Sequence, residues 1–336
     1  MNGPPNKPFS HKEQQMKAVF LDRGTFLEGL ALPKPQGIDE YQTFDETPQD
    51  DQLIIERCQG AQIIFTNKVK ISAEVIAALP DLKLIQLTAT GMNNVDADAC
   101  KKQGVELYNV AGYAVKSVPE HTFMLMLAAL RSGVHYHNKV IDGSWEASGN
   151  FSLMDVPLID LEDTTLGIIG VGTIGKRVTE IAKAFGMTVL WAEHQGQAPR
   201  NDEYTDFDTV LETSDVISLH CPLTEKTAHL INADTLAKMS KKPLVVNVAR
   251  GGIVDSKAIV EALEQGQVLG YATDVFEQEP TTQEDPLWQL GQKNHPRLIF
   301  SPHNAWASKA AQQKLWDILT EQVSEFITTH KHSVSS

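Results

Sequence analysis

Cysteine is scarce in this chain of 336 residues, which holds only Cys58, Cys100 and Cys221. The three are far apart and lack the spacing of a metal or redox motif. We therefore expect reduced thiols in a cytoplasmic protein. No other residues have metal-ligand spacing either, so no metal is expected.

Long apolar runs and an excess of positive charge are also missing. The longest strongly apolar stretch, residues 123–130, is far shorter than the ~20 residues needed to span a bilayer. With 29 basic and 43 acidic residues, the formal net charge is −14. A nucleic-acid or anionic-membrane partner would require a basic face, so we expect neither. An acidic protein must hold an anionic substrate with local cations.

The length is too great for one ordinary core and predicts two domains. Residues 1–15 are polar, contain three prolines and lack the apolar run of a secretory signal, so we expect a flexible tail. Short apolar runs that predict strands fall into two series, at 17–22, 61–66, 82–88 and 105–110, and at 165–169, 188–192, 215–220, 244–248, 270–274 and 297–301. Helical patterns separate them, which predicts α/β domains with mostly parallel sheets covered on both faces.

Three segments outside these strands have distinct characters. Residues 120–131 are apolar nearly all round and predict a helix buried between domains or subunits. A polar segment follows at 132–163, in which Trp145 either packs locally or reaches a neighbouring subunit's pocket. The helical pattern at 307–329 has no strand to follow, so we expect it to return to the first domain. A further helix is predicted at 72–79, with Ser72 as its N-cap.

The clearest motif is a glycine-rich turn made of Gly170, Val171, Gly172, Thr173, Ile174 and Gly175. It follows an apolar strand and opens a helix, which is the context in which G-x-G-x-x-G binds a dinucleotide. Gly170 permits the tight turn, Gly172 lets pyrophosphate approach the backbone, and Gly175 allows close helix–strand packing. The pyrophosphate would bind the free N–H groups of the helix N-terminus.

Glu193 ends the next predicted strand, close to the ~20-residue offset at which a carboxylate binds the adenosine ribose. A carboxylate there accepts hydrogen bonds from the ribose hydroxyls and repels a 2′-phosphate. The sequence therefore favours NAD(H) over NADP(H). His194 and Arg200 are close in sequence and can partly accommodate a phosphate.

Four further strands of the second series end in polar groups, at the sheet edge where open parallel sheets bind ligands. These groups are His220, Cys221 and Pro222 after one strand, Arg250 after the next, Asp274 with Glu277 and Glu279 after the third, and His303 after the last. Each has an ordinary structural explanation by itself: Cys221, for example, is expected to be a small apolar filler. Catalysis is indicated by their combination, because one dinucleotide-binding domain has an arginine, a glutamate and a histidine at its strand ends.

Reduction of a 2-oxo acid requires this set. The planar guanidinium of Arg250 can bind the carboxylate and polarise the carbonyl. His303 can donate a proton to the developing alkoxide, because histidine ionises near neutral pH. Glu279 can orient the imidazole and stabilise its protonated form, while the cofactor carries the hydride. We therefore predict hydride transfer between NAD(H) and C2 of a small 2-hydroxy/2-oxo acid.

The chain resembles the D-isomer-specific 2-hydroxyacid dehydrogenase family over about residues 17–325. The motifs GIIGVGTIG, SLHCPLT, NVARGGIVD, ATDVFEQEP and SPHNAWAS carry the resemblance, in this order. It implies that Arg250, Glu279 and His303 are catalytic and that Asp274 contacts the nicotinamide carboxamide. The cofactor-binding residues that it implies are Gly170, Gly172, Thr173, Ile174, Gly175, Glu193, His220, Cys221, Pro222, Ala249, Arg250, Asp274 and His303.

The first domain matches the family as well. Its segment TATGMNNVD resembles the loop whose backbone amides hold the substrate carboxylate. The substrate-binding residues implied are Asn67, Thr90, Gly91, Arg250 and His303.

Family architecture implies a Rossmann NAD-binding domain at 117–303, inserted into a flavodoxin-like substrate domain formed by 16–116 and 304–331. Both would be doubly wound parallel-sheet domains. In the family the chain crosses between the two domains twice, which here falls near residues 111–119 and near His303. The resemblance implies a hinge at these two crossover segments and a homodimer built around the cofactor domains.

Within the family, the segments TNKV, TATGMNNVD, WAEH and PHNAWAS are most similar to the glycerate dehydrogenase (hydroxypyruvate reductase) branch. This implies hydroxypyruvate and D-glycerate as the substrate pair, with glyoxylate as a second substrate. Two departures are Glu193, where aspartate is commoner, and Asn304, where an apolar residue often follows the histidine. D-Lactate, phosphoglycerate or a broad range of 2-keto acids are alternatives. From another functional class, an NAD-sensing scaffold or corepressor shares the fold.

Overall fold

The computed structural model describes residues 15–333 and divides the chain into two compact units. The first unit comprises the chain up to Tyr113 and again from Lys309, and the second is Ala114–Ser308. The second unit is thus inserted into the first, as predicted. All but the last residue of the predicted tail at 1–15 lies outside the described residues.

The unit boundaries differ by a few residues from those expected at 116/117 and 303/304. Residues 304–308 stay with the second unit because the backbone N–H groups of Asn304 and Ala305 donate to the carboxylate of Asp274. Ser117 Oγ also donates to the carbonyl of Ala305 over 2.6 Å, so the two crossover segments are tied together inside this unit.

The first unit is built on a five-stranded parallel sheet in the order β2-β1-β3-β4-β5, the flavodoxin-like order. Its elements are β1 (Lys17–Phe20), β2 (Glu40–Thr43), α1 (Asp51–Cys58), β3 (Ile63–Thr66), α2 (Ala73–Ala77), β4 (Leu84–Leu87), α3 (Ala97–Gln103), β5 (Glu106–Tyr108) and α12 (Lys309–Ser333). The predicted N-cap is confirmed, since the Ser72 side chain accepts a hydrogen bond from Val75 N.

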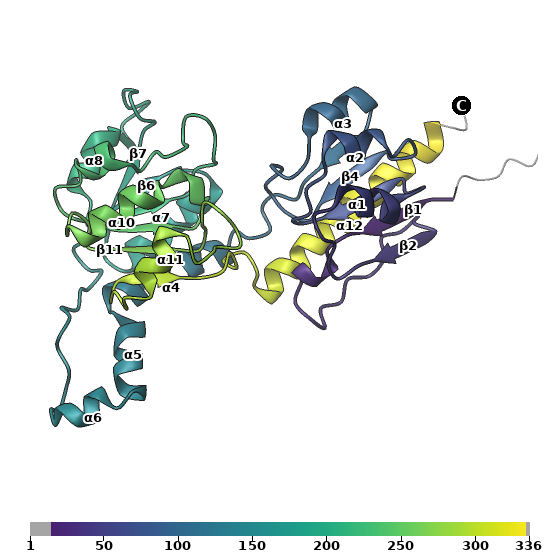
Figure 1. The fold of residues 1–336 in the computed structure, drawn as a ribbon. Helices are drawn as coiled ribbons and strands as arrows, with labels where there is room; N and C mark the ends of the chain where they lie inside the picture. The colour runs from purple at the N-terminus through teal and green to yellow at the C-terminus, as the bar shows by residue number, and fades with distance from the viewer. Residues whose placement is uncertain (1–14, 334–336) are drawn as a thin grey trace, which may run out of the picture. The chain divides into compact units, whose positions relative to one another are not determined.

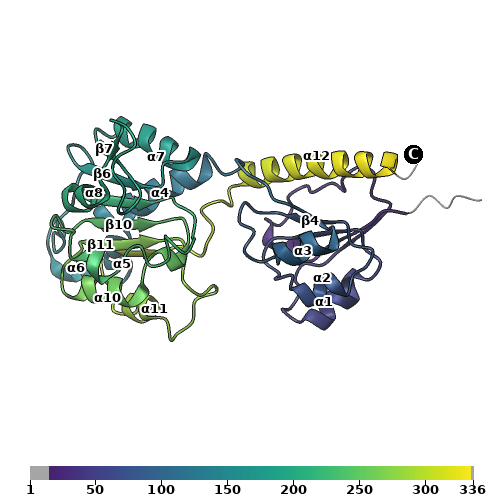
Figure 2. The same cartoon turned by 90° about the horizontal axis from the view of Figure 1, so that it is seen from above.

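Successive side chains of each strand face opposite layers of helices. Val19 and Ile64 pack in the core with residues of α1, α2 and α3. Phe20 and Phe65 face α12, whose fully buried Trp316 stacks on Phe20 at 5.8 Å between ring centroids. Figure 2 shows α12 along one face of the sheet, with α1 and α2 beyond the other. The predicted return of the last helix to the first domain is confirmed.

The second unit has a seven-stranded sheet in the order β12-β11-β10-β9-β6-β7-β8, in which all neighbours are parallel. This is the Rossmann order with one further strand. Its elements are α4 (Ser117–Leu130), α5 (Gly133–Ile141), α6 (Ser144–Ser148), β6 (Thr165–Ile169), α7 (Thr173–Ala184), β7 (Thr188–Ala192), β8 (Tyr204–Thr205), α8 (Phe207–Thr213), β9 (Val216–Leu219), α9 (Ala233–Leu236), β10 (Leu244–Asn247), α10 (Ser256–Glu264), β11 (Gly270–Thr273), α11 (Pro286–Gly291) and β12 (Leu298–Phe300).

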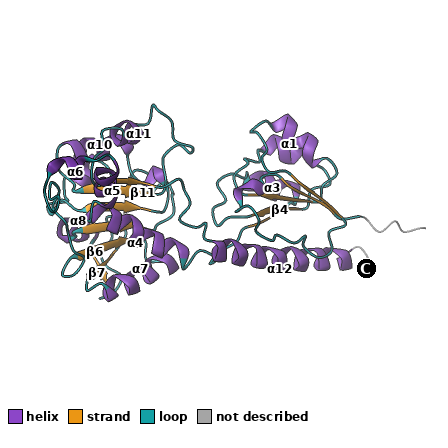
Figure 3. Ribbon diagram, turned by 90° about the horizontal axis from the view of Figure 1, so that it is seen from below, coloured by secondary structure: helices purple, strands orange, loops and turns teal. Residues whose placement is uncertain are grey.

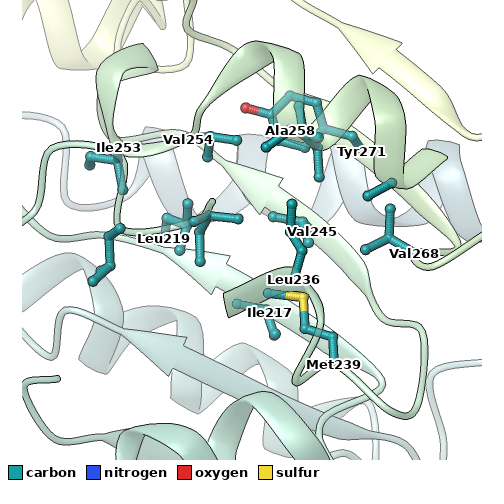
Figure 4. Close-up of a cluster of buried hydrophobic side chains, with 14 of the residues drawn as sticks. Ile217, Leu219, Leu236, Met239, Val245, Ile253, Val254, Ala258, Val268 and Tyr271 are labelled. Carbon is teal, nitrogen blue, oxygen red and sulfur yellow. The ribbon is translucent and has the colours of Figure 1, made fainter. Parts of the chain in front are cut away.

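Helices cover both faces of this sheet (Figure 3). Ile217 and Val245 point to the layer of α8, α9, α10 and α11, where Met239 packs on them (Figure 4). Their neighbours Val216 and Val246 point to the opposite layer, formed by α4 and α7. Both faces of every central strand are therefore buried, which explains the continuous apolar runs in the sequence.

Helix α4 is the apolar helix that the sequence predicts to be buried between domains or subunits. Its buried residues, among them Phe123 and Met126, pack on β10, β11, β12 and α7 of the same unit. One side of the helix is therefore buried against its own sheet, while Met124 of the same helix is 46% exposed.

Residues 133–158, here called the arm, were expected to be a polar segment but form α5 and α6. Figure 1 shows them projecting away from the sheet of their unit. No residue of either helix is buried, while Ile141, Phe151 and Met154 are 74%, 98% and 84% exposed. Arg297 fixes the base of the arm, since its guanidinium donates to carbonyls at the end of α4 and at Pro157.

Candidate active site

The glycine turn between β6 and α7 has the geometry of a phosphate cradle. Gly170 has φ +100°, and a Cβ there would lie 2.4 Å from Cys221 N. A Cβ on Gly175 would lie 2.5 Å from the carbonyl oxygen of Gly170, whereas one on Gly172 would meet nothing within 4 Å. No side chain caps α7, which begins at Thr173. Open space therefore faces uncapped N–H groups, including that of Ile174, which fits a pyrophosphate.

The end of β7 differs from the free carboxylate that the sequence predicts. Glu193 is 2% exposed, and both of its oxygens accept hydrogen bonds from the guanidinium of Arg200. The backbone N–H groups of Arg200 and His194 donate to it as well, at 3.0 and 2.8 Å. Arg200, followed by these N–H groups, holds the pKa of Glu193 well below its ordinary value. The carboxylate is therefore ionised and already fully bonded within the chain.

The residues after β9 are neutral. Burial lowers the pKa of His220 to about 4, so its imidazole carries no charge at neutral pH, and its Nε2 lies 2.9 Å from Ser218 Oγ. Burial raises the pKa of Cys221 to about 11, which leaves a thiol without nucleophilic character. The exposed Pro222 turns the chain, and its carbonyl accepts from Thr227 Oγ1. Cys221 lies in a hydrophobic core cluster, which agrees with the prediction that it is a small apolar filler.

Arg250 is held at the end of β10 by its own turn. The side chain of Asn247 accepts from Ala249 N and donates to the carbonyl of Arg250. A Cβ on Gly251 would lie 1.9 Å from the backbone carbon of Phe276, so glycine is required where the β11 loop crosses. The guanidinium of Arg250 donates to the carbonyl of Ala249, and no carboxylate of the described residues pairs with it. Its charge remains available for an anion.

Glu279 and His303 are brought together from two different loops. Their side chains join through Oε2 and Nδ1 at 2.6 Å, and Glu279 Oε1 accepts from Phe276 N. The backbone of His303 has φ +51°, held by its N–H to the Asp274 carbonyl and by Trp306 Nε1 donating to its carbonyl. Such a left-handed conformation at a non-glycine residue is uncommon and is frequent at functional sites.

Asp274 supports the segment that carries His303. Its carboxylate, 1% exposed, accepts from Ser301 Oγ at 2.6 Å and from the N–H groups of Asn304 and Ala305. His121 of α4 lies beside it, with Nε2 2.8 Å from Ser301 Oγ. The carboxylate is thus committed to positioning this segment. Sequence reasoning missed His121 and Ser301, although a histidine within an apolar helix is a recognisable signal.

In the first unit, the predicted substrate residues lie after β3 and β4. Asn67 is buried, and its Nδ2 has no hydrogen-bond partner. Thr90 Oγ1 donates to the carbonyl of Val110, which fixes the loop that contains Gly91. The structure brings these residues to neighbouring strands, because β3 pairs with β4.

Asp22 is a further residue of this loop cluster that sequence reasoning did not single out. Its buried carboxylate, at the end of β1, accepts from the backbone N–H groups of Asn67, Lys68 and Val69 and from Thr66 Oγ1. It therefore fixes the turn that carries Asn67. The rule that polar residues follow apolar strands would have found it.

Among residues 15–333, no cluster of three or more histidine, cysteine or acidic side chains is arranged to hold a metal ion. In the same part of the chain, every helix is too short or too polar to cross a membrane.

The family model for the D-isomer specific 2-hydroxyacid dehydrogenase NAD binding domain matches residues 123–305. The chain belongs to the D-isomer specific 2-hydroxyacid dehydrogenase family. It is an oxidoreductase that acts on the CH–OH group of 2-hydroxy acids with NAD or NADP, as the family does.

Similar proteins include a glycerate dehydrogenase from Methylorubrum extorquens, 41% identical with 95% of this chain and 98% of the relative covered. A hydroxypyruvate reductase from Blautia hydrogenotrophica is 34% identical, with 93% and 97% covered. Among solved structures, D-lactate dehydrogenase from Aquifex aeolicus has a TM-score of 0.74 at 27% identity, with 93% and 96% covered. The names of these three proteins refer to glycerate, hydroxypyruvate and D-lactate.

Proposed function

We propose that this 2-hydroxyacid dehydrogenase reduces hydroxypyruvate to D-glycerate, with glyoxylate as a second substrate. The names of the Methylorubrum and Blautia relatives support this substrate class. The observation that carries the catalytic part is the 2.6 Å contact between His303 and Glu279. It lies at the strand-end edge that also carries the unpaired Arg250 and the open glycine turn.

The chemistry of the three side chains follows from their contacts. An ionised carboxylate only accepts hydrogen bonds, so Nδ1 of His303 carries a proton toward Glu279. Nε2 is then the atom that gives a proton to the substrate oxygen during reduction and takes it back during oxidation. Arg250 binds the substrate carboxylate and stabilises negative charge that develops on the C2 oxygen.

The dinucleotide that we propose is NAD(H), held by the glycine turn and by residues at the ends of β7 and β9. When bound, the nicotinamide supplies the hydride that C2 accepts, and the proton from His303 completes the alcohol. In the first unit, the amide of Asn67 and the N–H groups of Thr90 and Gly91 are the proposed donors to the substrate. They suit an anion because the protein is acidic overall, so local donors must provide the attraction.

An NADH-oxidation assay across hydroxypyruvate, glyoxylate, pyruvate and 3-phosphohydroxypyruvate tests the substrate. We expect the highest kcat/KM with hydroxypyruvate. A higher value with pyruvate or the phosphorylated acid would replace the proposed substrate by that acid. NADH binding without turnover of any 2-oxo acid would instead support a nucleotide-sensing scaffold.

We also propose a homodimer in which the arm covers a second copy of this chain. Ile141, Phe151 and Met154 expose large apolar surfaces that solvent disfavours. Substitution of Phe151 and Met154 by aspartate is expected to give a folded monomer by light scattering. A dimer of unchanged mass would contradict this use of the arm.

A further inference from the structure

At the end of β7, an arginine pairs with the carboxylate that would bind the adenosine ribose. A carboxylate repels a 2′-phosphate effectively only when no cation is paired with it. Glu193 accepts four directed hydrogen bonds, from the backbone N–H and two guanidinium nitrogens of Arg200 and from the backbone N–H of His194. Nδ1 of His194 lies 2.8 Å from both Glu193 Oε1 and Arg200 Nη2. A carboxylate offers about four lone-pair sites. A ribose hydroxyl can therefore bond to Glu193 only by displacing a contact that exists within the chain.

The arginine is held in place from several directions. Its Nε lies 2.7 Å from Glu193 Oε2, and its guanidinium carbon lies 4.4 Å from the centroid of the Tyr204 ring. Tyr204 belongs to β8, which pairs with β7, and Glu193 N donates to the carbonyl of Thr205. The loop between the two strands is thus closed around the Glu193–Arg200 pair.

The exposure of the charged groups is unequal. The side chain of Glu193 is 1% exposed, whereas those of Arg200 and His194 are 48% and 66% exposed. Of the five N–H groups of a guanidinium, those on Nη1 of Arg200 have no hydrogen-bond partner within residues 15–333. The negative charge is therefore buried and neutralised, and solvent meets the cation and the imidazole.

We infer that Arg200, and not Glu193 alone, sets the choice between the two nicotinamide dinucleotides, and that the chain accepts NADPH as well as NADH. The free Nη1 hydrogens and the exposed imidazole of His194 are the groups that would meet a 2′-phosphate. Arginine suits this ligand because its planar donors match phosphate oxygens. The inference rests on the proposed function, since it concerns the cofactor of the same site.

Binding and turnover should be measured together with NADH and NADPH. The fluorescence of the bound dinucleotide gives the two dissociation constants. For the natural chain, we expect them to agree within about tenfold, because the charges of Glu193 and Arg200 approximately cancel. The kcat/KM values with NADH and NADPH should likewise agree within about tenfold. Isothermal titration of 2′,5′-ADP against 5′-ADP isolates the contribution of the 2′-phosphate.

Two substitutions should move the preference in opposite directions. Arg200→Gln exposes an unpaired Glu193 and should weaken NADPH relative to NADH by at least about tenfold. Glu193→Gln leaves an unpaired Arg200 and should strengthen NADPH relative to NADH. Because a single change can destabilise the loop, the double variant Glu193→Gln with Arg200→Gln removes both charges and should give an intermediate ratio.

The matched control is Lys293→Gln, which removes an exposed cation from a pair with Glu264 and should leave the ratio unchanged. A natural preference for NADH above about a hundredfold, or a ratio that Arg200→Gln does not change, would overturn the inference while leaving the proposed function intact. Failure of both dinucleotides to bind would overturn both.

Discussion

His303 and Glu279 are 24 positions apart, yet Nδ1 of the imidazole lies 2.6 Å from Oε2 of the carboxylate. The carboxylate is itself oriented by Phe276 N, and the histidine backbone is held by Asp274 and Trp306. Both partners are therefore fixed before a substrate binds, which is the condition for effective proton transfer.

Substitution of His303 by asparagine should lower kcat for keto-acid reduction by about 10²–10⁴-fold, because it removes the proposed proton donor. Glu279→Gln should cause a smaller loss and alter the pH profile of kcat/KM, since the imidazole loses its ionised partner. Steady-state kinetics measures both. Dinucleotide binding should be retained, and Glu277→Gln on the same loop serves as control. Full turnover by the asparagine variant would exclude His303 as the donor.

Two glycines of the same turn should respond in different ways. Gly172→Ala places its methyl group in open space, so we expect normal stability and at least about tenfold weaker dinucleotide binding, because the methyl occupies the phosphate approach. Gly175→Ala meets the Gly170 carbonyl at 2.5 Å and should cost about 1–3 kcal/mol in free energy of unfolding. Urea unfolding and NADH titration separate the two effects. Equal destabilisation by both would contradict these distinct roles.

His220 should make the stability of the protein depend on pH. Its pKa is lowered from 6.5 to about 4 by burial, so between these values the unfolded chain binds a proton that the folded chain does not. Stability is therefore lost as pH falls below 6.5. Between pH 7 and 5, we expect the His220→Gln variant to lose about 1–2 kcal/mol less free energy of unfolding than the natural chain.

Denaturant titrations at the two pH values measure this difference. The exposed His137 is the matched control, and His137→Gln should show the same pH dependence as the natural chain. An unchanged slope for His220→Gln would show that its imidazole is not neutral in the folded state.

Asp22→Asn should weaken the loop that carries Asn67. An amide oxygen can take the place of Oδ2, which accepts from all three backbone N–H groups, but the NH₂ group then replaces Oδ1 and opposes the N–H of Asn67. We expect a loss of about 1–3 kcal/mol in stability and a higher KM for the keto acid with little change in the NADH dissociation constant. The exposed Asp45 gives the control Asp45→Asn, and a change confined to NADH binding would contradict the assignment.

Central strands were predictable because both of their faces are buried. The runs at 165–169 and 188–192 coincide with β6 and β7, and the other runs contain strands that end within two residues of the predicted limits. The edge strands β2 and β8 were missed. The residues of β2 are exposed or half-buried, and β8 has only two residues, so neither carries an apolar signal. The helices of the arm were missed for a related reason, since they bury no face within the unit.

Sequence determined which groups stand at the strand ends, because apolar runs, glycine spacing and the polar residues that follow them are local features. It therefore gave the fold class and placed Arg250, Glu279 and His303 at one sheet edge. Only the tertiary structure decided which of those groups are free. Glu193 is neutralised by Arg200, seven positions away, and Asp274 is occupied by Ser301 and the backbone beyond it. Such pairings depend on how loops fold back over the sheet, and no local pattern records them.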